Sequence, residues 1–203
     1  MLSRAPSFAT PRSVSPAHDA TEREWVARVR LGDERAVESL FEAYYPALCD
    51  FVQSYLRSPD SAEDVVQTVF LRIWEHRATW QPTSGVRAYL FAACRNRALG
   101  ALKHDRVVAR SAAQVTSELV AHASGRGDMA PDEAAQAREL ARALGAAVDR
   151  LPERRRTVVL LRWQHQMSYA EIAGVLGISV KTVEVHIGRA LAFLRKHLVH
   201  LRP

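Results

Sequence analysis

The 203-residue chain has only two cysteines, Cys49 and Cys94, and neither belongs to a group with metal-ligand spacing. We expect both to be reduced core residues, which excludes a disulfide framework and a thiolate-bound metal. The histidines are scattered, and the chain has no nucleophile elbow, no phosphate-binding loop and no isolated pair of carboxylates on an apolar face. These absences argue against an enzyme, and we expect no catalytic residues, no cofactor and no metal.

Long apolar runs are also absent. No segment approaches the roughly 20 apolar residues that a membrane-spanning helix needs. The first 20 residues are rich in Ser, Pro and Ala and lack the apolar region of a secretory signal. We therefore expect a disordered leader over residues 1–20 and a cytoplasmic protein without membrane insertion.

No stretch of useful length alternates between apolar and polar residues, so the sequence gives no sign of β-strands. Hydrophobic residues make up 48% of the chain, enough for an ordinary globular core. They recur at helical spacing in residues 21–110 and 132–203, whereas residues 111–131 are dominated by small residues and contain Gly and Pro. The sequence thus predicts an all-α protein, with two small helical domains (21–110 and 132–203) joined by a flexible linker (111–131).

Acidic residues are scarce in one segment and frequent in another. The chain has 28 Lys and Arg against 22 Asp and Glu, a net charge of +6. Between Arg87 and Arg110 the only acid is Asp105, while Glu22 to Glu75 is mainly acidic. This division predicts one surface for a protein partner and another for nucleic acid.

Capping residues predict where several helices begin. Thr21 and Glu24 have the spacing of a capping box, Asp33 can cap the next helix, and Ser61 can cap the one after that. Pro46 is expected either to break the second of these helices or to start a new one. A long helix is expected at about residues 84–108.

The segment "MSYAEIAGVLGISVKTVEVHIGRALAFLRKHL" has the pattern of a helix-turn-helix. Ser168 and Glu171 form a second capping box, Gly177 stands where a left-handed residue ends the first helix, and Ser179 can cap the second. The outer side of that second helix would meet base edges and phosphates. The candidate DNA-binding residues are Arg155, Ser179, Val180, Lys181, Thr182, Glu184, Val185, His186 and Arg189, and the neighbouring Arg154 and Arg156 suit phosphate contacts. The alternative is a helical hairpin that packs only for stability.

Both halves of the chain resemble one family. "GDERAVESLFEAYYPALCDFVQSYLRSPDSAEDVVQTVFLRIWEHR" is similar to region 2 of the extracytoplasmic-function sigma factors, relatives of sigma-70. "RAYLFAACRNRALGALKHDR" is similar to the part that meets the −10 element, and "LPERRRTVVLLRWQHQMSYAEIAGVLGISVKTVEVHIGRAL" is similar to region 4. The resemblance implies an alternative sigma factor that binds core RNA polymerase, directs it to specific promoters and helps to melt the −10 element.

The resemblance also implies partners and site residues. Asp64, Gln67, Leu71 and Arg72 would bind the β′ clamp helices of core RNA polymerase, and the β flap is a further partner. The −10 element of promoter DNA would be bound by Arg87, Tyr89, Arg95, Asn96, Arg97, Lys103 and Arg106, with the loop Thr79 to Gly85 forming a pocket for a flipped base. Region 4 would bind the −35 element, and the family usually has an anti-sigma factor as a partner.

Two other classes of protein share the helix-turn-helix. A response regulator would need alternating strands and helices, which residues 21–110 do not predict. A ligand-sensing repressor stays open, because an all-α N-terminal half could enclose a small molecule. A repressor would bind promoter DNA unaided and would not bind core polymerase.

Overall fold

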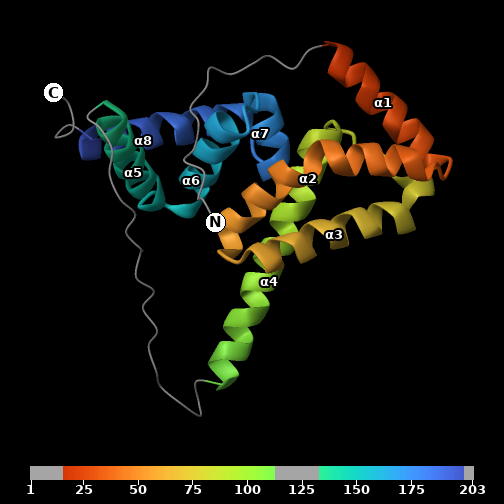
Figure 1. Cartoon of the computed structure of the whole chain (residues 1–203), viewed down its shortest axis with the longest axis horizontal. Helices are drawn as coiled ribbons and strands as arrows, with labels where there is room; N and C mark the ends of the chain where they lie inside the picture. The colour runs from red at the N-terminus through yellow and green to blue at the C-terminus, as the bar shows by residue number, and fades with distance from the viewer. Residues whose placement is uncertain (1–15, 113–132, 199–203) are drawn as a thin grey trace.

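The computed structural model describes residues 16–112 and 133–198, and these residues form helices without a β-strand (Figure 1). The all-α fold class is therefore confirmed. The predicted leader, except for its last residues, and the predicted linker, except for its first two residues, lie outside the described part of the chain. Within that part, no helix is long and apolar enough to cross a bilayer.

The N-terminal half consists of four α-helices and a 3₁₀ turn. α2 packs against α1, α3 and α4, and α1 rises from the α1–α2 turn at a steep angle to α2 (Figure 1). The centre of this half is Phe51, whose ring is fully buried and contacts the ring of Phe91 with 5.0 Å between centroids. The elements are α1 (Pro16–Arg30), α2 (Glu34–Leu56), α3 (Pro59–Glu75), the 3₁₀ turn η1 (Arg77–Thr79) and α4 (Val86–Ala112).

The C-terminal half contains the helix-turn-helix. Its elements are α5 (Glu133–Asp149), α6 (Glu153–Val159), the π-helical segment η2 (Leu160–Gln164), α7 (Tyr169–Leu176) and α8 (Val180–Leu198). The predicted capping box is confirmed, because Ser168 Oγ accepts from the amide of Glu171 and the Glu171 carboxylate accepts from the amide of Ser168. Gly177 ends α7 with a φ of 63°, as predicted, and Ser179 Oγ accepts from the amide of Thr182 at 3.1 Å.

Two predicted helix starts are wrong, and the long helix predicted from about residue 84 starts two residues later. α1 begins at Pro16, so Thr21 lies inside the helix and does not cap it. α3 begins at Pro59, and its cap is Ser58, whose Oγ accepts from the amide of Ser61 at 3.3 Å. Proline suits the first position of a helix because its missing N–H has no partner to lose there. α4 begins at Val86, since Gly85 before it has a φ of 85°.

Pro46 neither breaks nor starts a helix, contrary to expectation, because α2 continues through it to Leu56. A proline inside a helix removes one hydrogen bond and costs about 3 kcal/mol. Tyr44 and Leu48, on either side of it, are buried in the core. Their burial offsets the lost hydrogen bond and keeps the two parts of α2 in line.

The two halves pack against each other, which the sequence did not predict. α4 lies against α7, and a single hydrophobic core runs from Phe51 in α2 to Ile172 in α7. The hydroxyl groups of Tyr55 and Thr157 form a hydrogen bond of 2.7 Å between the halves. Arg87 adds a hydrogen bond to the carbonyl oxygen of His165 and an ion pair with Glu171. We call the contact formed by Tyr55, Arg87, Thr157, His165 and Glu171 the junction.

Candidate protein and nucleic-acid interfaces

One side of α3 is buried and the other is open to solvent. The side chains of Val65, Val66, Val69, Phe70 and Ile73 form the buried side. The residues predicted to bind core polymerase all lie on the open side, since Asp64, Gln67, Leu71 and Arg72 are exposed. Leu71 is 56% exposed although it is apolar. Single exposed apolar residues are common on protein surfaces, so Leu71 is available as an anchor for a partner but does not by itself identify an interface.

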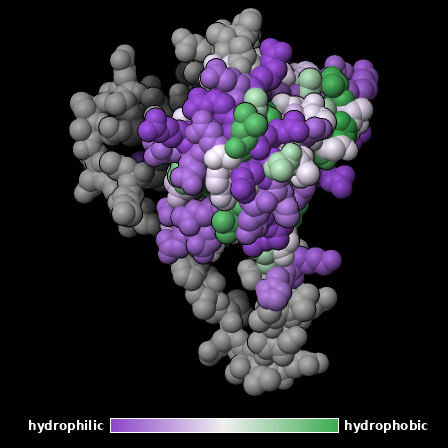
Figure 2. Space-filling view, turned by 90° about the vertical axis from the view of Figure 1, so that its right-hand side faces the viewer, coloured by the Kyte–Doolittle hydropathy of each residue, from purple (hydrophilic) through white to green (hydrophobic). Residues whose placement is uncertain are grey.

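The surface around the C-terminal end of α3 is mostly hydrophilic. Figure 2 shows the side of the molecule that carries the α1–α2 turn, and hydrophobic residues form only small, separate areas on it. One exposed apolar residue in that turn is Leu31, which is 88% exposed.

A groove lies between α3 and α4. Three of the residues predicted to bind the −10 element line it: Tyr89, Asn96 and Arg97. Asp64 and Arg72 of α3 line the same groove, so the predicted polymerase face and the predicted DNA face adjoin. Asn96 and Arg97 are exposed, and an amide and a guanidinium can bind a base edge and a phosphate.

The other residues predicted to bind the −10 element do not share this position. Arg87 faces the C-terminal half, where its guanidinium lies 3.7 Å from Glu171 Oε1. Arg95 lies against Tyr55, and its Nε is buried and has no hydrogen-bond partner among the residues that the structure describes. Lys103 is exposed on α4, whereas Arg106 belongs to α4 with a side chain outside the described part. The structure thus places Tyr89, Asn96 and Arg97 at an open groove, whereas Arg87 belongs to the junction and Arg95 lies beside the junction residue Tyr55.

The loop before α4 borders a cavity of about 840 Å³. Residues 81–85 form one wall, and Glu22 and Val26 of α1 form another. Ser168 and Glu171 of the C-terminal half complete the lining, which the sequence did not predict. Trp80 is buried beside the loop and packs edge-on against Tyr89, with 5.9 Å between ring centroids, so it acts as a packing residue.

The N-terminal end of α8 presents the predicted −35 residues to solvent. Val180, Lys181, Glu184, Val185 and Arg189 are exposed, while Thr182 and Ser179 hold the turn together through their hydroxyl groups, 2.9 Å apart. Lys181 Nζ and Glu184 Oε2 lie 3.4 Å apart and form an exposed ion pair. Such a pair contributes at most about 1 kcal/mol, so both side chains can exchange it for contacts with a base.

His186 marks a concentration of positive charge beside this face. Burial and the charges of Arg155, Arg154 and Arg189 lower the pKa of His186 below its usual value. The arginines come from α6 and α8, so the fold brings the predicted Arg155 to the predicted helix face. Phosphate groups are the anions that such a cluster fits.

Both cysteines are free thiols; Cys94 is buried in the core, whereas Cys49, also predicted to be a core residue, is half-buried. Burial raises the pKa of Cys94 to about 12 and also raises the pKa of Cys49. A protonated, buried thiol is a poor nucleophile and a poor metal ligand. Within the described residues, no three His, Cys, Asp or Glu side chains are grouped as a metal ion would require.

The sequence analysis did not predict that Tyr55, Thr157 and His165 belong to an interface between the halves. It predicted Glu171 as a helix-capping residue but not its ion pair with Arg87. The Tyr55–Thr157 hydrogen bond joins residues 102 positions apart in the chain. Periodicity shows which side of a helix is buried but not which distant segment covers it. A single sequence therefore holds no signal for these pairs.

Two family models match the chain. The model described as "Sigma-70 region 2" matches residues 40–107, and the one described as "Sigma-70, region 4" matches residues 141–194. The ECF RNA polymerase sigma factor RpoE of Cereibacter sphaeroides is 29% identical over 189 residues, 89% of this chain and 98% of the relative. The RNA polymerase sigma factor CnrH of Cupriavidus metallidurans is 31% identical over 176 residues, 85% of this chain and 92% of the relative.

Two solved structures of sigma factors are similar in fold to this chain. The structure of CnrH in complex with the cytosolic domain of CnrY is similar with a TM-score of 0.62 and 26% identity, and the match covers 89% of this chain and 98% of CnrH. The sigma factor RpoE from Bartonella quintana, solved in complex with the anti-sigma factor NepR, has the same fold. Its TM-score is 0.58 at 23% identity, over 79% of this chain and 95% of that one.

Proposed function

Because the chain belongs to the extracytoplasmic-function sigma factors and directs RNA polymerase to promoters, we propose how its surfaces divide this work. The N-terminal half, residues 21–110, binds core polymerase and the −10 element, and the C-terminal half, residues 132–203, binds the −35 element. The observation that carries the proposal is the presence of two solvent-facing sets of residues, one on α3 and α4 and one on α8.

In this proposal the open side of α3 binds the β′ clamp helices. Asp64, Gln67 and Arg72 provide polar contacts, and Leu71 provides the apolar anchor. This assignment is supported by the exposure of these side chains to solvent, on the side of α3 opposite the one buried in the core. The rigid core beneath α3 holds them in fixed positions, which lowers the entropy cost of binding.

The β flap binds the C-terminal half. The support for this position is a small, mostly apolar cavity of about 140 Å³ between α5 and the π-helical segment, which is large enough for an apolar side chain of a partner. Val148, Val159, Leu160 and Trp163 line it. A cavity of this kind gives a partner an anchor point rather than a flat contact.

The groove between α3 and α4 binds the −10 element and helps to hold it open. Tyr89 offers a ring on which an unpaired base can stack, and Asn96 can pair with a base edge. Arg97, Lys103 and Arg106 bind phosphates, and the loop Thr79 to Gly85 receives a flipped base. Capture of bases that have left the duplex favours the melted state. Arg87 and Arg95 join this site when the two halves separate at the junction.

An anti-sigma factor is a further partner. CnrH and the Bartonella quintana RpoE are both solved in complexes, the first with CnrY and the second with the anti-sigma factor NepR. By similarity, we infer that a protein of this kind binds the present chain and blocks its polymerase and promoter contacts.

The −35 face is α8 with its neighbouring arginines. Ser179, Thr182 and His186 support the turn and the phosphate contacts, together with Arg155 and Arg189. Lys181 and Glu184 read bases, and the methyl groups of Val180 and Val185 contact thymine.

Replacing Lys181 or Glu184 with Ala tests this assignment. We expect each change to alter the preferred −35 sequence, because a good bidentate contact discriminates between bases by about 1–3 kcal/mol. Selection of bound promoters from a library randomised at −35, with polymerase containing each variant, measures the preference. Arg195→Ala, in the last turn of the same helix, is the control and should leave it unchanged. If both test variants select the wild-type sequence, neither residue reads the DNA.

A further inference from the structure

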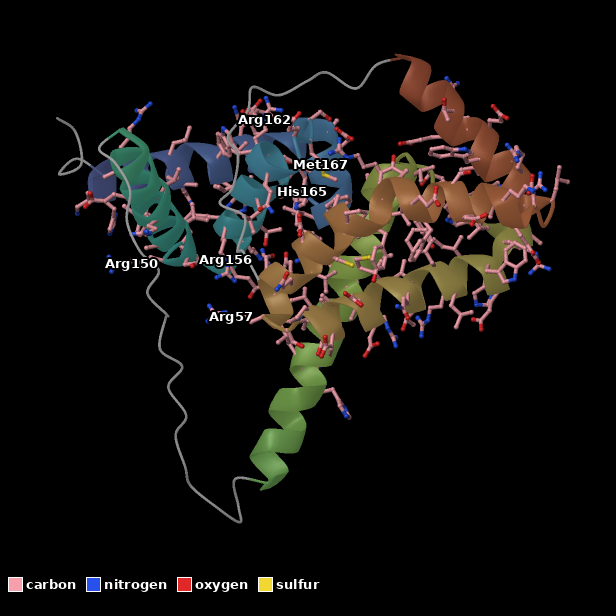
Figure 3. The ribbon with its side chains drawn as sticks, viewed as in Figure 1. Arg57, Arg150, Arg156, Arg162, His165 and Met167 are labelled. Atoms are coloured by element: carbon pink, nitrogen blue, oxygen red, sulfur yellow. The ribbon has the colours of Figure 1, made fainter. Side chains whose placement is uncertain are left out.

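A histidine is buried between the two halves of the protein. His165 follows the π-helical segment of the C-terminal half and is only 6% exposed (Figure 3). Its ring lies edge-on to two rings of the N-terminal half, with centroids 5.6 Å from Phe51 and 4.9 Å from Phe91. The imidazole therefore fills an apolar space that exists only while the halves are packed together.

The surroundings of this ring disfavour a positive charge. Nε2 is buried and has no hydrogen-bond partner within the described residues. Arg87 donates to the carbonyl oxygen of the same residue, which brings a guanidinium close to the ring. Burial, with a smaller contribution from Arg87, lowers the pKa of His165 to about 3. Attraction between a charged imidazole and the neighbouring aromatic rings does not offset burial of this extent.

The acids around the junction have other partners. Glu171 of α7 pairs with Arg87 of α4 and accepts from the amide of Ser168 at 2.7 Å. Tyr44 of α2 donates to Glu22 of α1. The hydroxyl of Tyr55 is bonded to Thr157. None of these groups lowers the cost of a proton on His165.

We propose that His165 makes the junction acid-labile: the two halves stay packed while its imidazole is neutral and separate when it is protonated. In the separated state water reaches the ring, so the histidine binds a proton at its ordinary pKa of about 6.5. The open state then holds more protons than the closed state at pH values between about 3 and 6.5. By linkage, closure is at full strength above that pH and weakens as the pH falls.

The size of the effect follows from the two pKa values. Below about 6.5, each pH unit lowers the closure equilibrium constant about tenfold until the pKa of the closed state is reached. Between pH 8 and pH 5 the loss is about 30-fold. A cell that becomes acidic inside would in this way increase the open fraction without another factor.

Separation of the two halves also exposes groups that the proposed function assigns to binding of the −10 element. Arg87 loses Glu171 and the His165 carbonyl as partners, and the loop cavity loses its wall from the C-terminal half. This consequence rests on the proposed −10 role of Arg87. The acid-labile junction itself does not.

Small-angle X-ray scattering of the full chain from pH 8 to pH 5 tests the junction without DNA or polymerase. We expect the radius of gyration to rise below pH 6.5 while the helical circular dichroism signal stays constant. His165→Phe fills the same space without a titrating group, so it should stay compact at every pH, and His165→Leu serves if the Phe variant does not fold. His76→Gln is the matched control, because His76 is exposed on the N-terminal half, and it should expand like the wild type.

Four results would overturn the proposal. The wild type could keep one radius of gyration throughout, His165→Phe and His165→Leu could expand at the same pH as the wild type, or expansion could occur only with loss of helix. A chain already expanded at pH 8 would count against it as well. None of these results bears on whether the protein starts transcription. The acid-labile junction and the proposed function can therefore be disproved independently of each other.

Discussion

Replacing Gln67 and Leu71 together with Ala is expected to weaken binding to core RNA polymerase about 30-fold or more. Removal of an apolar anchor and a neighbouring polar contact from the centre of an interface costs about 2 kcal/mol or more. Both side chains are exposed on α3, so the fold should remain intact, with a stability change of about 0.5 kcal/mol or less. Titration of fluorescently labelled core with the variant measures the affinity, and thermal unfolding checks the fold.

The chain offers a matched control for this experiment. Leu31 and Gln53 are also an exposed Leu and an exposed Gln of the N-terminal half, but they lie outside α3. Leu31→Ala with Gln53→Ala should therefore leave the affinity for core unchanged. Equal affinities for the wild type and the Gln67/Leu71 variant would move the polymerase-binding face away from this side of α3.

Phe51→Ala is expected to cost about 3–5 kcal/mol of unfolding free energy. A buried phenylalanine loses both its transfer free energy and its packing when it is cut back to alanine. Phe51 is fully buried and its ring contacts Tyr55, Phe91 and His165, so neighbours on three sides would face the cavity. This is a large fraction of the 5–15 kcal/mol that stabilises a typical domain.

Urea unfolding followed by circular dichroism gives the free energy. Phe51→Leu keeps most of the volume and should cost about 1.5 kcal/mol or less. A loss of under about 1 kcal/mol for Phe51→Ala would mean that this ring is not at the centre of the core.

Local features of the fold could be predicted from the sequence because their causes are local. The Ser168–Glu171 capping box, the left-handed Gly177 and the buried side of α3 each depend on residues within one or two turns. Local reasoning failed where two signals competed. Ser58 followed by Pro59 starts α3 better than Ser61, and packing on both sides of Pro46 overrides the helix-breaking tendency of proline.

The junction could not be predicted because its pairs are far apart in the sequence. His165 had no suggested partner, yet it is buried against Phe51 and Phe91 of the other half. Arg87 was grouped with the DNA-binding residues on the basis of charge and family resemblance. Its contact with Glu171 depends on how α4 and α7 meet, and neither helix encodes that alone.

Transcription in vitro by purified core polymerase on fragmented genomic DNA, with and without this protein, tests the central claim most directly. The account predicts transcripts from a discrete set of start sites only when the protein is present, with a shared −35 and a shared −10 sequence upstream. If the protein instead binds promoter DNA unaided, does not associate with core and yields no new transcripts, the assignment to transcription initiation is contradicted.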